Sequence, residues 1–313
     1  MSKKGIFLGI LGLLSVLSKG SACCCCNATS SQEPYPVTIM SYNVDTPEKD
    51  WDAWNSWRKK SVVDVMTEFN LEDFYGLQET KHGGGPEVCD QIKAEINSRQ
   101  SVQAAQKEYD YISIQNLKNN PNQDCENSIF FDSKKWQCLL SDGLYVSTDW
   151  DPRYAFYGIF RNIHNPQQTV IVFNTHAPAG NWPHPGSHNG FLPEDFINIA
   201  QFIEETRKKV NPNHPELVPV IFSGDWNGNV QGQKDFQNIG LETCRIKAGK
   251  QGDVGPTWPS NHPTDAFDQI FAGQQGMEWS ESSITVKGRN MSSVESASDH
   301  LPIEAELYFL LLQ

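Results

Sequence analysis

Apolar and polar residues follow one another along this chain in patterns that predict short strands more often than helices. Strands are expected over residues 37–43, 74–78, 128–131, 136–140, 154–160, 169–174, 218–222, 267–271 and 303–310. The third of these is expected to pair with the fourth through the turn at 132–135. The fifth is expected to pair with the sixth through the turn at Asn165-Pro166.

Helical spacing of apolar residues is found over 54–69, 87–99 and 193–209. The last of these is the clearest, because Phe196, Ile197, Ala200, Phe202 and Ile203 form one apolar stripe and charged residues lie opposite. Strands outnumber helices, and many strands come in hairpin-like pairs. The pattern therefore favours an α/β fold with mixed, mostly antiparallel β-sheets and helices outside, over a doubly wound parallel sheet.

The N-terminus has the three-part pattern of a secretory signal. Lys3 and Lys4 precede an apolar run over 5–17, and small residues follow up to Ala22. The run is too short to span a bilayer comfortably, although a retained membrane anchor is the alternative. We expect residues 1–22 to be a signal peptide, 23–36 a cysteine-rich leader and linker, and 37–313 the folded domain. The mature protein is then expected to be secreted or periplasmic.

Cysteine usage adds two expectations. Cys23 begins a run of four cysteines, and cleavage directly before it leaves lipidation of Cys23, and membrane association through it, as an alternative. Four further cysteines, Cys89, Cys125, Cys138 and Cys244, are even in number and lie in a chain expected to reach an oxidising compartment, so one or two disulfides are expected. The spacing of these four disfavours a structural zinc site.

The charge balance restricts the function. The chain has 313 residues, with 38 acidic side chains against 25 Lys and Arg and a formal net charge of −13. A protein that holds nucleic acid by general electrostatics needs excess Lys and Arg to neutralise phosphates. The composition therefore argues against a stable nucleic-acid complex. It leaves open an enzyme that acts on phosphates through a metal ion, because carboxylates bind such ions.

Polar residues that can carry chemistry recur where the apolar strands end or begin, which is where rigid scaffolds usually place sites. They are Asn43, Glu79, His176, Asp225, Asn227, Asp268, Asp299 and His300. The segments that contain them are SYNV (41–44), LQET (77–80), NTHAP (174–178), GDWN (224–227), AFDQI (266–270) and SDHLP (298–302).

In this order and spacing, the set resembles the endonuclease/exonuclease/phosphatase superfamily, and several details resemble its deoxyribonuclease I-like members. The resemblance covers roughly residues 37–307. It implies a four-layer sandwich of two packed, mixed and mostly antiparallel β-sheets flanked by helices. The abasic-site endonuclease branch fits poorly because it has a tyrosine where His176 stands. The helix with Trp57-Arg58 also resembles an uncharacterised bacterial and fungal branch, which leaves the substrate open.

The resemblance implies a role for each candidate. His300 is expected to activate the attacking water, oriented by Asp268, and His176 to donate to the phosphoryl oxygens or the leaving group. Glu79, Asn43 and Asp299 are expected to bind Mg²⁺, with Mn²⁺ or Ca²⁺ as alternatives. The resemblance further implies that Glu126 orients His176, that Asp225 and Asn227 hold the water or a second metal, and that Arg153 contacts substrate phosphate. A surface ion pair is the alternative for Arg153.

The predicted function is hydrolysis of DNA by a secreted, metal-dependent, monomeric phosphodiesterase for which DNA is a transient partner. Two alternatives use the same scaffold. One is a phosphatase or a lipid (sphingomyelinase-like) phosphodiesterase, which the acidic charge favours. The other is a secreted nuclease-toxin subunit or a binding protein, for which one sequence cannot show the partner chains.

Overall fold

The structure is a computed structural model that describes residues 34–81, 87–114, 127–147, 153–179, 190–228, 233–247, 255–274, 278–288 and 291–311. Residues 33–313 form one compact unit. The expected signal peptide and all but the last three residues of the expected leader lie outside the described residues. Among the described helices, none is long and apolar enough to cross a membrane.

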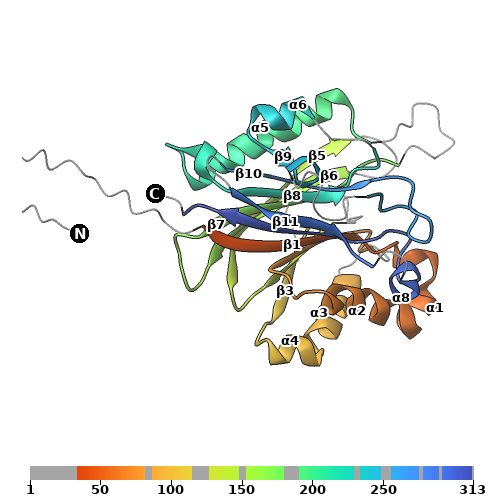
Figure 1. Cartoon of the computed structure of the whole chain (residues 1–313). Coiled ribbons are helices and arrows are strands. Elements are labelled where there is room, and N and C mark those ends of the chain that lie inside the picture. Colours follow the sequence, from red (N-terminus) through yellow and green to blue (C-terminus); the bar gives the residue numbers. More distant parts are fainter. Residues whose placement is uncertain are drawn as a thin grey trace, which may run out of the picture. The chain divides into compact units, whose positions relative to one another are not determined.

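Two six-stranded sheets form the centre of this unit (Figure 1). The first has the order β11-β12-β1-β2-β4-β3, with β1 Tyr35–Asn43, β2 Phe74–Gln78, β3 Tyr109–Ser113, β4 Ser128–Asp132, β11 Glu278–Val286 and β12 Ile303–Phe309. The second has the order β5-β6-β7-β8-β10-β9, with β5 Trp136–Ser147, β6 Arg153–Asn162, β7 Thr169–His176, β8 Val220–Asp225, β9 Glu242–Thr243 and β10 Asp268–Gly273. Only β1–β2 and β7–β8 pair in parallel, so the predicted mixed, mostly antiparallel sheets are confirmed.

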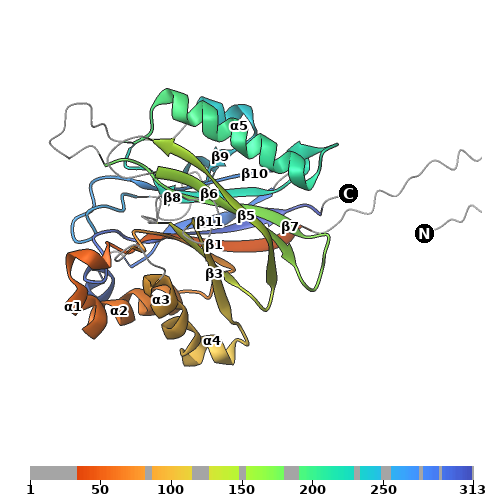
Figure 2. The ribbon, with the colours of Figure 1, turned by 180° about the vertical axis from the view of Figure 1, so that it is seen from behind.

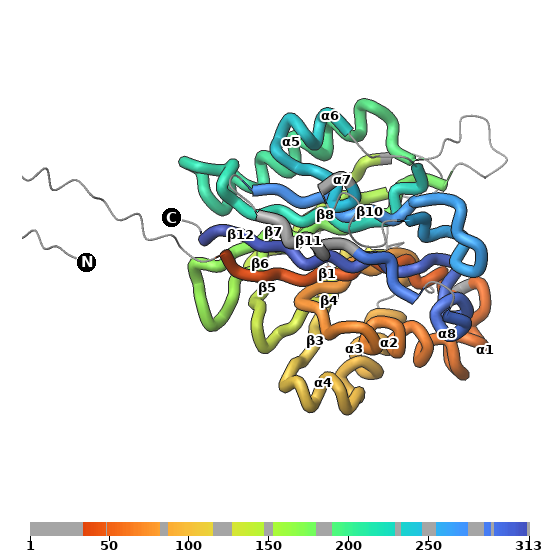
Figure 3. The backbone as a smooth tube through the Cα atoms, viewed as in Figure 1, coloured from red at the N-terminus to blue at the C-terminus, as the bar shows by residue number. Residues whose placement is uncertain are grey.

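Helices cover the outer face of each sheet, which completes four layers (Figures 1 and 2). The first sheet is covered by α1 Trp51–Ala53, a π-helical turn Trp54–Arg58, α2 Lys59–Glu68, α3 Glu87–Asn97, α4 Gln100–Ala104 and α8 Ser292–Glu295. The second sheet is covered by α5 Pro193–Val210 and α6 Lys234–Asn238. The remaining short helical elements are Pro47–Lys49, Pro215–Leu217 and α7 Cys244–Lys247. The backbone tube in Figure 3 shows the same layering, which confirms the predicted sandwich.

Three apolar cores hold the layers together. The inner core lies between the sheets, and one outer core lies under the helices of each sheet. Strand β1 shows how the alternation serves both sides, because Val37 and Ile39 face the inner core whereas Met40 and Tyr42 face the helices. This two-sided burial explains why the strands are more apolar than those of a sheet with one wet face.

One predicted hairpin is wrong. Strands β4 and β5 were expected to pair, but β4 pairs with β2 and β3 in the first sheet and β5 pairs with β6 in the second. The connection crosses between sheets: Ser133 N donates to Glu108 O (2.7 Å), whereas Lys135 O accepts from Ile163 N (2.9 Å). The other predicted hairpin, β6 with β7, is confirmed.

The described cysteines do not form the expected disulfides. Cys89, Cys138 and Cys244 are free thiols, and burial raises the pKa of the Cys89 thiol to about 11. The fourth cysteine, Cys125, lies outside the described residues. Buried thiols with such raised pKa values behave as small apolar side chains rather than as reactive groups.

Candidate functional site

The strand ends that carry the candidate residues meet at one place between the two sheets. Parallel strands β7 and β8 end together, and β10 begins beside them, so that His176 and Asp268 are the register partners of Asp225 on its two sides. The first sheet contributes Asn43 at the end of β1 and Glu79 directly after β2. Asn43 and Asp225 are 182 positions apart in sequence and are hydrogen-bonded to each other.

Asp225 is the centre of this arrangement and is almost fully buried. Its Oδ2 accepts a hydrogen bond from Asn43 Nδ2 (3.0 Å) and lies 3.6 Å from both His176 Nε2 and His300 Nε2. Its Oδ1 accepts from the backbone nitrogen of Asn227 (3.0 Å). Two imidazole rings therefore face the same carboxylate oxygen, His176 from the end of β7 and His300 from the segment before β12.

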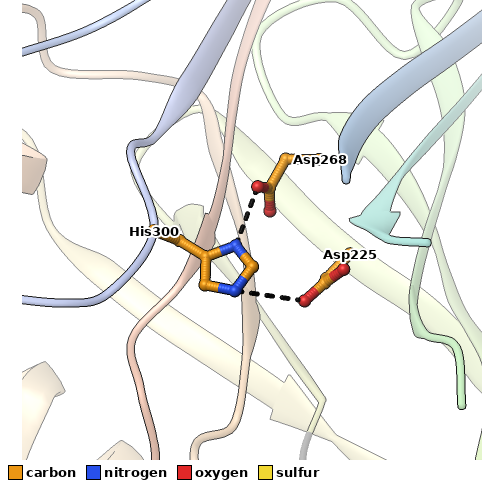
Figure 4. Close-up of side chains that lie close together, drawn as sticks. All are labelled: Asp225, Asp268 and His300. Atoms are coloured by element: carbon orange, nitrogen blue, oxygen red, sulfur yellow. Dashed lines mark hydrogen bonds and ion pairs between the residues drawn. The ribbon is translucent and has the colours of Figure 1, made fainter. Parts of the chain in front are cut away.

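His300 forms a buried pair with Asp268 (Figure 4). Nδ1 of His300 lies 2.9 Å from Oδ2 of Asp268, and because a carboxylate only accepts, the imidazole donates through Nδ1. Burial lowers the pKa of His300, but the charges of Asp268, Asp225 and Asp299 outweigh it and raise the pKa to about 10. In the absence of a cation, His300 is therefore an imidazolium at neutral pH.

The side-chain amide of Asn43 joins the two sheets. Its Oδ1 accepts from the backbone nitrogen of Asp45 (2.9 Å), and its Nδ2 donates to Glu79 Oε1 and Asp225 Oδ2, both at 3.0 Å. The backbone N–H fixes which end is the oxygen, since only an acceptor can face a donor. Asn43 therefore presents its nitrogen to the two carboxylates. Its expected role as a metal ligand, which needs the oxygen, stays a prediction.

Two site residues have left-handed backbone conformations that are unusual for their type. Glu79 has φ of 60° and Asn227 has φ of 46°. Asn tolerates this region, whereas for Glu it costs free energy and is found where surrounding contacts enforce it. Thr46 N donates to Glu79 Oε2 (2.8 Å) and Val44 N donates to Gln78 O (3.1 Å), and these bonds hold Glu79 in place.

Arg153 reaches the site from the start of β6 and is buried, so the alternative of a surface ion pair is wrong. Its Nη1 lies 3.1 Å from Nδ1 of His176. The ring of His176 thus has Arg153 on one side and Asp225 on the other. Glu126, which was expected to orient His176, lies outside the described residues.

Asp299 lies at the more exposed side of the site. Its Oδ1 is 4.0 Å from His300 Nε2, and its Oδ2 is 3.5 Å from the indole nitrogen of Trp258. Partial burial raises the pKa of Asp299, with Asp45 and Glu79 adding to the rise and His300 opposing it. The nine predicted residues that the structure describes are therefore all connected, directly or through a neighbour.

Sequence reasoning missed three residues that shape the site. Thr46 holds Glu79, and Trp258 contacts Asp299. Ser298 donates to Asn43 O (2.6 Å) and accepts from His300 N (3.1 Å), which joins the last motif to the first strand. The sequence could have identified Ser298, because it is the first residue of the SDHLP segment. Thr46 was not, because it acts through its backbone nitrogen.

The residues present fit a hard divalent cation. Ligand atoms of Asp225, Asp268 and His300 lie within 4.8 Å of one another, and the group is buried. Asp268 Oδ1 is buried without a hydrogen-bond partner in the described part of the chain. Glu79 brings a third carboxylate close, because Asn43 Nδ2 donates to both Glu79 and Asp225. Carboxylate oxygens of this kind are the ligands that suit Mg²⁺, Mn²⁺ or Ca²⁺.

Solved structures with the same architecture identify the fold. An endonuclease/exonuclease/phosphatase from Bacteroides vulgatus superposes with a TM-score of 0.64 at 18% identity, over 88% of this chain and 100% of that one. The chain has the endonuclease/exonuclease/phosphatase fold. This confirms, for the fold, the resemblance drawn from the six motifs.

Two other proteins with this fold have more specific names. A mannosyl-6-phosphatase from Bacteroides thetaiotaomicron superposes with a TM-score of 0.61 at 18% identity, over 87% of this chain and 100% of that one. Truncated TDP2 from Caenorhabditis elegans superposes with a TM-score of 0.58 at 16% identity, over 88% of this chain and 98% of that one.

Sequence comparison adds less. No family model matches the chain. One curated relative, an uncharacterized calcium-binding protein of Arabidopsis thaliana, is 35% identical over 66 residues. That match covers 21% of this chain and 12% of the relative, so this chain aligns with a small part of it.

Proposed function

We propose that the protein is a divalent-cation-dependent phosphoester hydrolase. One observation carries this proposal: His176 Nε2 and His300 Nε2 both lie 3.6 Å from Asp225 Oδ2, in a buried centre rich in carboxylates. Phosphoester cleavage by water needs a base for the nucleophile, charge neutralisation on the phosphoryl oxygens and help for the leaving oxygen. Two imidazoles and a set of oxygen ligands can supply all three.

His300 is the proposed general base. Asp268 accepts the Nδ1 hydrogen, which leaves Nε2 of the neutral ring, 3.6 Å from Asp225 Oδ2, as the atom that would take a proton from the attacking water. A base must be neutral, whereas His300 alone among its carboxylates has a pKa of about 10. Positive charge added beside those carboxylates favours the neutral ring, so the proposed chemistry depends on the cation.

His176 is the proposed donor to the phosphoryl oxygens or the leaving group, through the Nε2 hydrogen that faces Asp225. Arg153, beside its Nδ1, adds a positive charge on the other side of the ring and is the proposed phosphate contact. Asn227 and Asp299 are proposed to hold the water at the two edges of the site. Water attacks phosphorus directly, and no covalent enzyme intermediate forms.

The cation would be held by Glu79, with Asn43 and Asp299 or the Asp225 and Asp268 carboxylates completing the set. When bound, it neutralises charge on the phosphoryl oxygens. We propose Mg²⁺, with Mn²⁺ or Ca²⁺ as alternatives, because hard oxygen ligands suit all three.

The substrate class has two candidates. The motif resemblance to deoxyribonuclease I-like enzymes favours DNA. The net charge of −13 and the shared fold with a mannosyl-6-phosphatase favour a small phosphate ester instead. A lipid phosphodiester and a toxin-subunit nuclease remain further outcomes of the same test.

A substrate panel tests the proposal. Plasmid DNA, RNA, sphingomyelin, a sugar 6-phosphate and a generic phosphodiester are incubated with the full mature chain in Mg²⁺ or EDTA. Hydrolysis of one class that stops in EDTA supports the proposal, and the class that is cleaved identifies the substrate. Hydrolysis that continues in EDTA contradicts the cation, and no hydrolysis of any member contradicts the enzyme.

We also propose that the chain is secreted or periplasmic after cleavage near Ala22, and that it acts as a monomer. The support is the basic, apolar and small-residue pattern of residues 1–22. N-terminal sequencing of the exported protein tests it: a free N-terminus at Cys23 supports cleavage, a blocked lipid-bearing Cys23 supports anchoring, and an intact Met1 contradicts both.

A further inference from the structure

A buried polar contact between the two sheets lies directly beneath the site and has no role in the chemistry proposed above. It is made by Gln78, the residue before Glu79, and by Asn174, two residues before His176. Both side chains are fully buried. Gln78 belongs to the first sheet and Asn174 to the second, so the contact joins the two halves of the site from below.

Every polar atom of the Asn174 side chain has a partner. Its Nδ2 donates to the backbone oxygens of Leu77 (2.8 Å) and Ser128 (2.9 Å), which lie on β2 and β4 of the opposite sheet. Its Oδ1 accepts from Gln78 Nε2 (2.7 Å) and, at 3.4 Å, from Ser223 Oγ. The two backbone carbonyls can only accept, which fixes the orientation of the amide.

Gln78 is held as firmly at its nitrogen but not at its oxygen. Besides Asn174, its Nε2 has Gly76 O (3.1 Å) and Ser41 Oγ (3.2 Å) within hydrogen-bond distance, and its two hydrogens are shared among these three acceptors. Its Oε1 is buried and has no hydrogen-bond partner in the described part of the chain. A buried acceptor without a partner costs free energy, so packing alone does not account for an amide at this position.

The consequence for the site is geometric. Leu77 and Gln78 are the last residues before Glu79, whose backbone turns into the left-handed region, and Asn174 precedes His176 on the same strand. Any sliding of one sheet over the other would move Glu79 relative to His176 and Asp225. The Gln78–Asn174 contact opposes this sliding with directional bonds, whereas the apolar inner core opposes it only through shape.

We propose that Gln78 and Asn174 are positioning residues that set the register between the half of the site that carries Glu79 and the half that carries His176 and Asp225. The proposal rests on the proposed function for its metal readout. Residues that orient ligands from outside the ligand shell typically change metal affinity or activity 10- to 100-fold when removed.

The test uses Gln78→Met, Asn174→Leu and the double variant, each nearly the same size as the residue that it replaces. Asn162→Ala is the matched control. Asn162 is a buried Asn at the end of β6 that lies away from Arg153, and in the described part of the chain its side chain bonds only to the turn that follows it. Mn²⁺ affinity by calorimetry, kcat and KM, and urea unfolding are measured for all four. Imidazole NMR signals of His176 and His300 report the site without any activity.

Each single variant is expected to bind Mn²⁺ about 10-fold more weakly. The change in kcat is expected to be larger than the change in KM. Removing both polar partners returns part of the stability, because neither amide then faces an apolar replacement of the other, but Mn²⁺ affinity stays low. Asn162→Ala loses stability alone. The inference is overturned if folded single variants keep wild-type affinity and imidazole signals, or if affinity returns with stability in the double variant.

Failure of the proposed function looks different. In that case the wild-type chain binds no Mn²⁺ and cleaves no phosphoester, and the imidazole signals still decide the inference. Signals that move in Gln78→Met and Asn174→Leu but not in Asn162→Ala support a positioning role. Signals that are unchanged in all of them contradict it.

Discussion

Asp225 is the residue on which the geometry of the site depends most. Among the residues that the structure describes, it is the carboxylate that lies 3.6 Å from both imidazoles, and it is also joined to Asn43 from the other sheet. Each histidine is fixed on its far side by a different group, His300 by Asp268 and His176 by Arg153. The rings therefore differ in environment, which is how one site can contain both a base and a donor.

Replacement of either histidine tests this assignment. His300→Ala and His176→Ala are each expected to lower kcat by about 10²–10⁴-fold, because each removes a proton-transfer or donor group. His214→Ala is the control, since His214 is an exposed histidine away from the site motifs. Activity assays are paired with circular dichroism, and full activity in either site variant would rule out the assignment.

A second residue-scale prediction concerns stability and lies outside the site. Glu72 is buried, and its two carboxylate oxygens have no hydrogen-bond partner in the described part of the chain. Burial raises its pKa to about 8, with the charges of Glu304 and Asp73 adding to the rise. Between pH 4.5 and about 8, Glu72 therefore keeps its proton in the folded protein, whereas in the unfolded chain it releases that proton near pH 4.5.

The sign follows from proton linkage. Because the folded state binds more protons between pH 4.5 and about 8, the free energy of unfolding falls as pH rises through this window. Glu72→Gln is expected to flatten this fall and to be more stable than wild type at pH 8.5. Urea unfolding at pH 5 and 8.5 measures the difference, with exposed Glu68→Gln as the control. An equal pH slope in wild type and Glu72→Gln is the contrary result.

At the scale of elements, local pattern and tertiary packing agree for most strands and part of the helices. Helix α5 matches its prediction to within one residue, although Ile197 of the expected apolar stripe is exposed and Ile199 is buried instead. Trp57, an apolar residue within the predicted helix 54–69, is 46% exposed and lies in the π-helical turn Trp54–Arg58. Strands β3 and β11 were not predicted.

A close approach of the two sheets at Gly76 gives a prediction at this scale. A methyl group on Gly76 of β2 would overlap Ser223 Oγ of β8. Gly76→Ala is expected to lower stability by about 1–3 kcal/mol through overpacking. Adding Ser223→Ala removes the overlapping oxygen, so the double variant should be more stable than the sum of the single changes predicts. Urea unfolding of all three variants gives the coupling free energy between the two substitutions. Strictly additive effects would contradict an overlap between the added methyl group and the Ser223 hydroxyl as the cause of the instability.

At the scale of the whole molecule, the net charge and the motif resemblance favour different substrates. The fold is shared with TDP2 and with a mannosyl-6-phosphatase, whereas 38 acidic against 25 basic residues make the chain repel polyanions. Part of the acid excess is accounted for by the site, where Glu79, Asp225, Asp268 and Asp299 gather. The remaining charge acts at long range and is screened by salt.

Ionic strength therefore separates the two substrate classes. If duplex DNA is cleaved, the KM for DNA is expected to decrease as the salt concentration is raised from 20 to 200 mM, because screening weakens the repulsion between two polyanions. KM for a small sugar phosphate should change much less. Steady-state kinetics at constant Mg²⁺ measures both. A KM for DNA that rises steeply with salt would indicate a basic binding surface and contradict this prediction.

The sequence by itself determined the candidate residues, the strands that present them and the class of sheet, because alternation and strand-end polarity are local properties of the chain. Only the tertiary structure decided which sheet β4 and β5 join, which end of the Asn43 amide faces the carboxylates, and that Arg153 is buried. The bond between Asn43 and Asp225 spans 182 positions. A contact of that separation depends on how two sheets pack, and no periodicity within either strand encodes it.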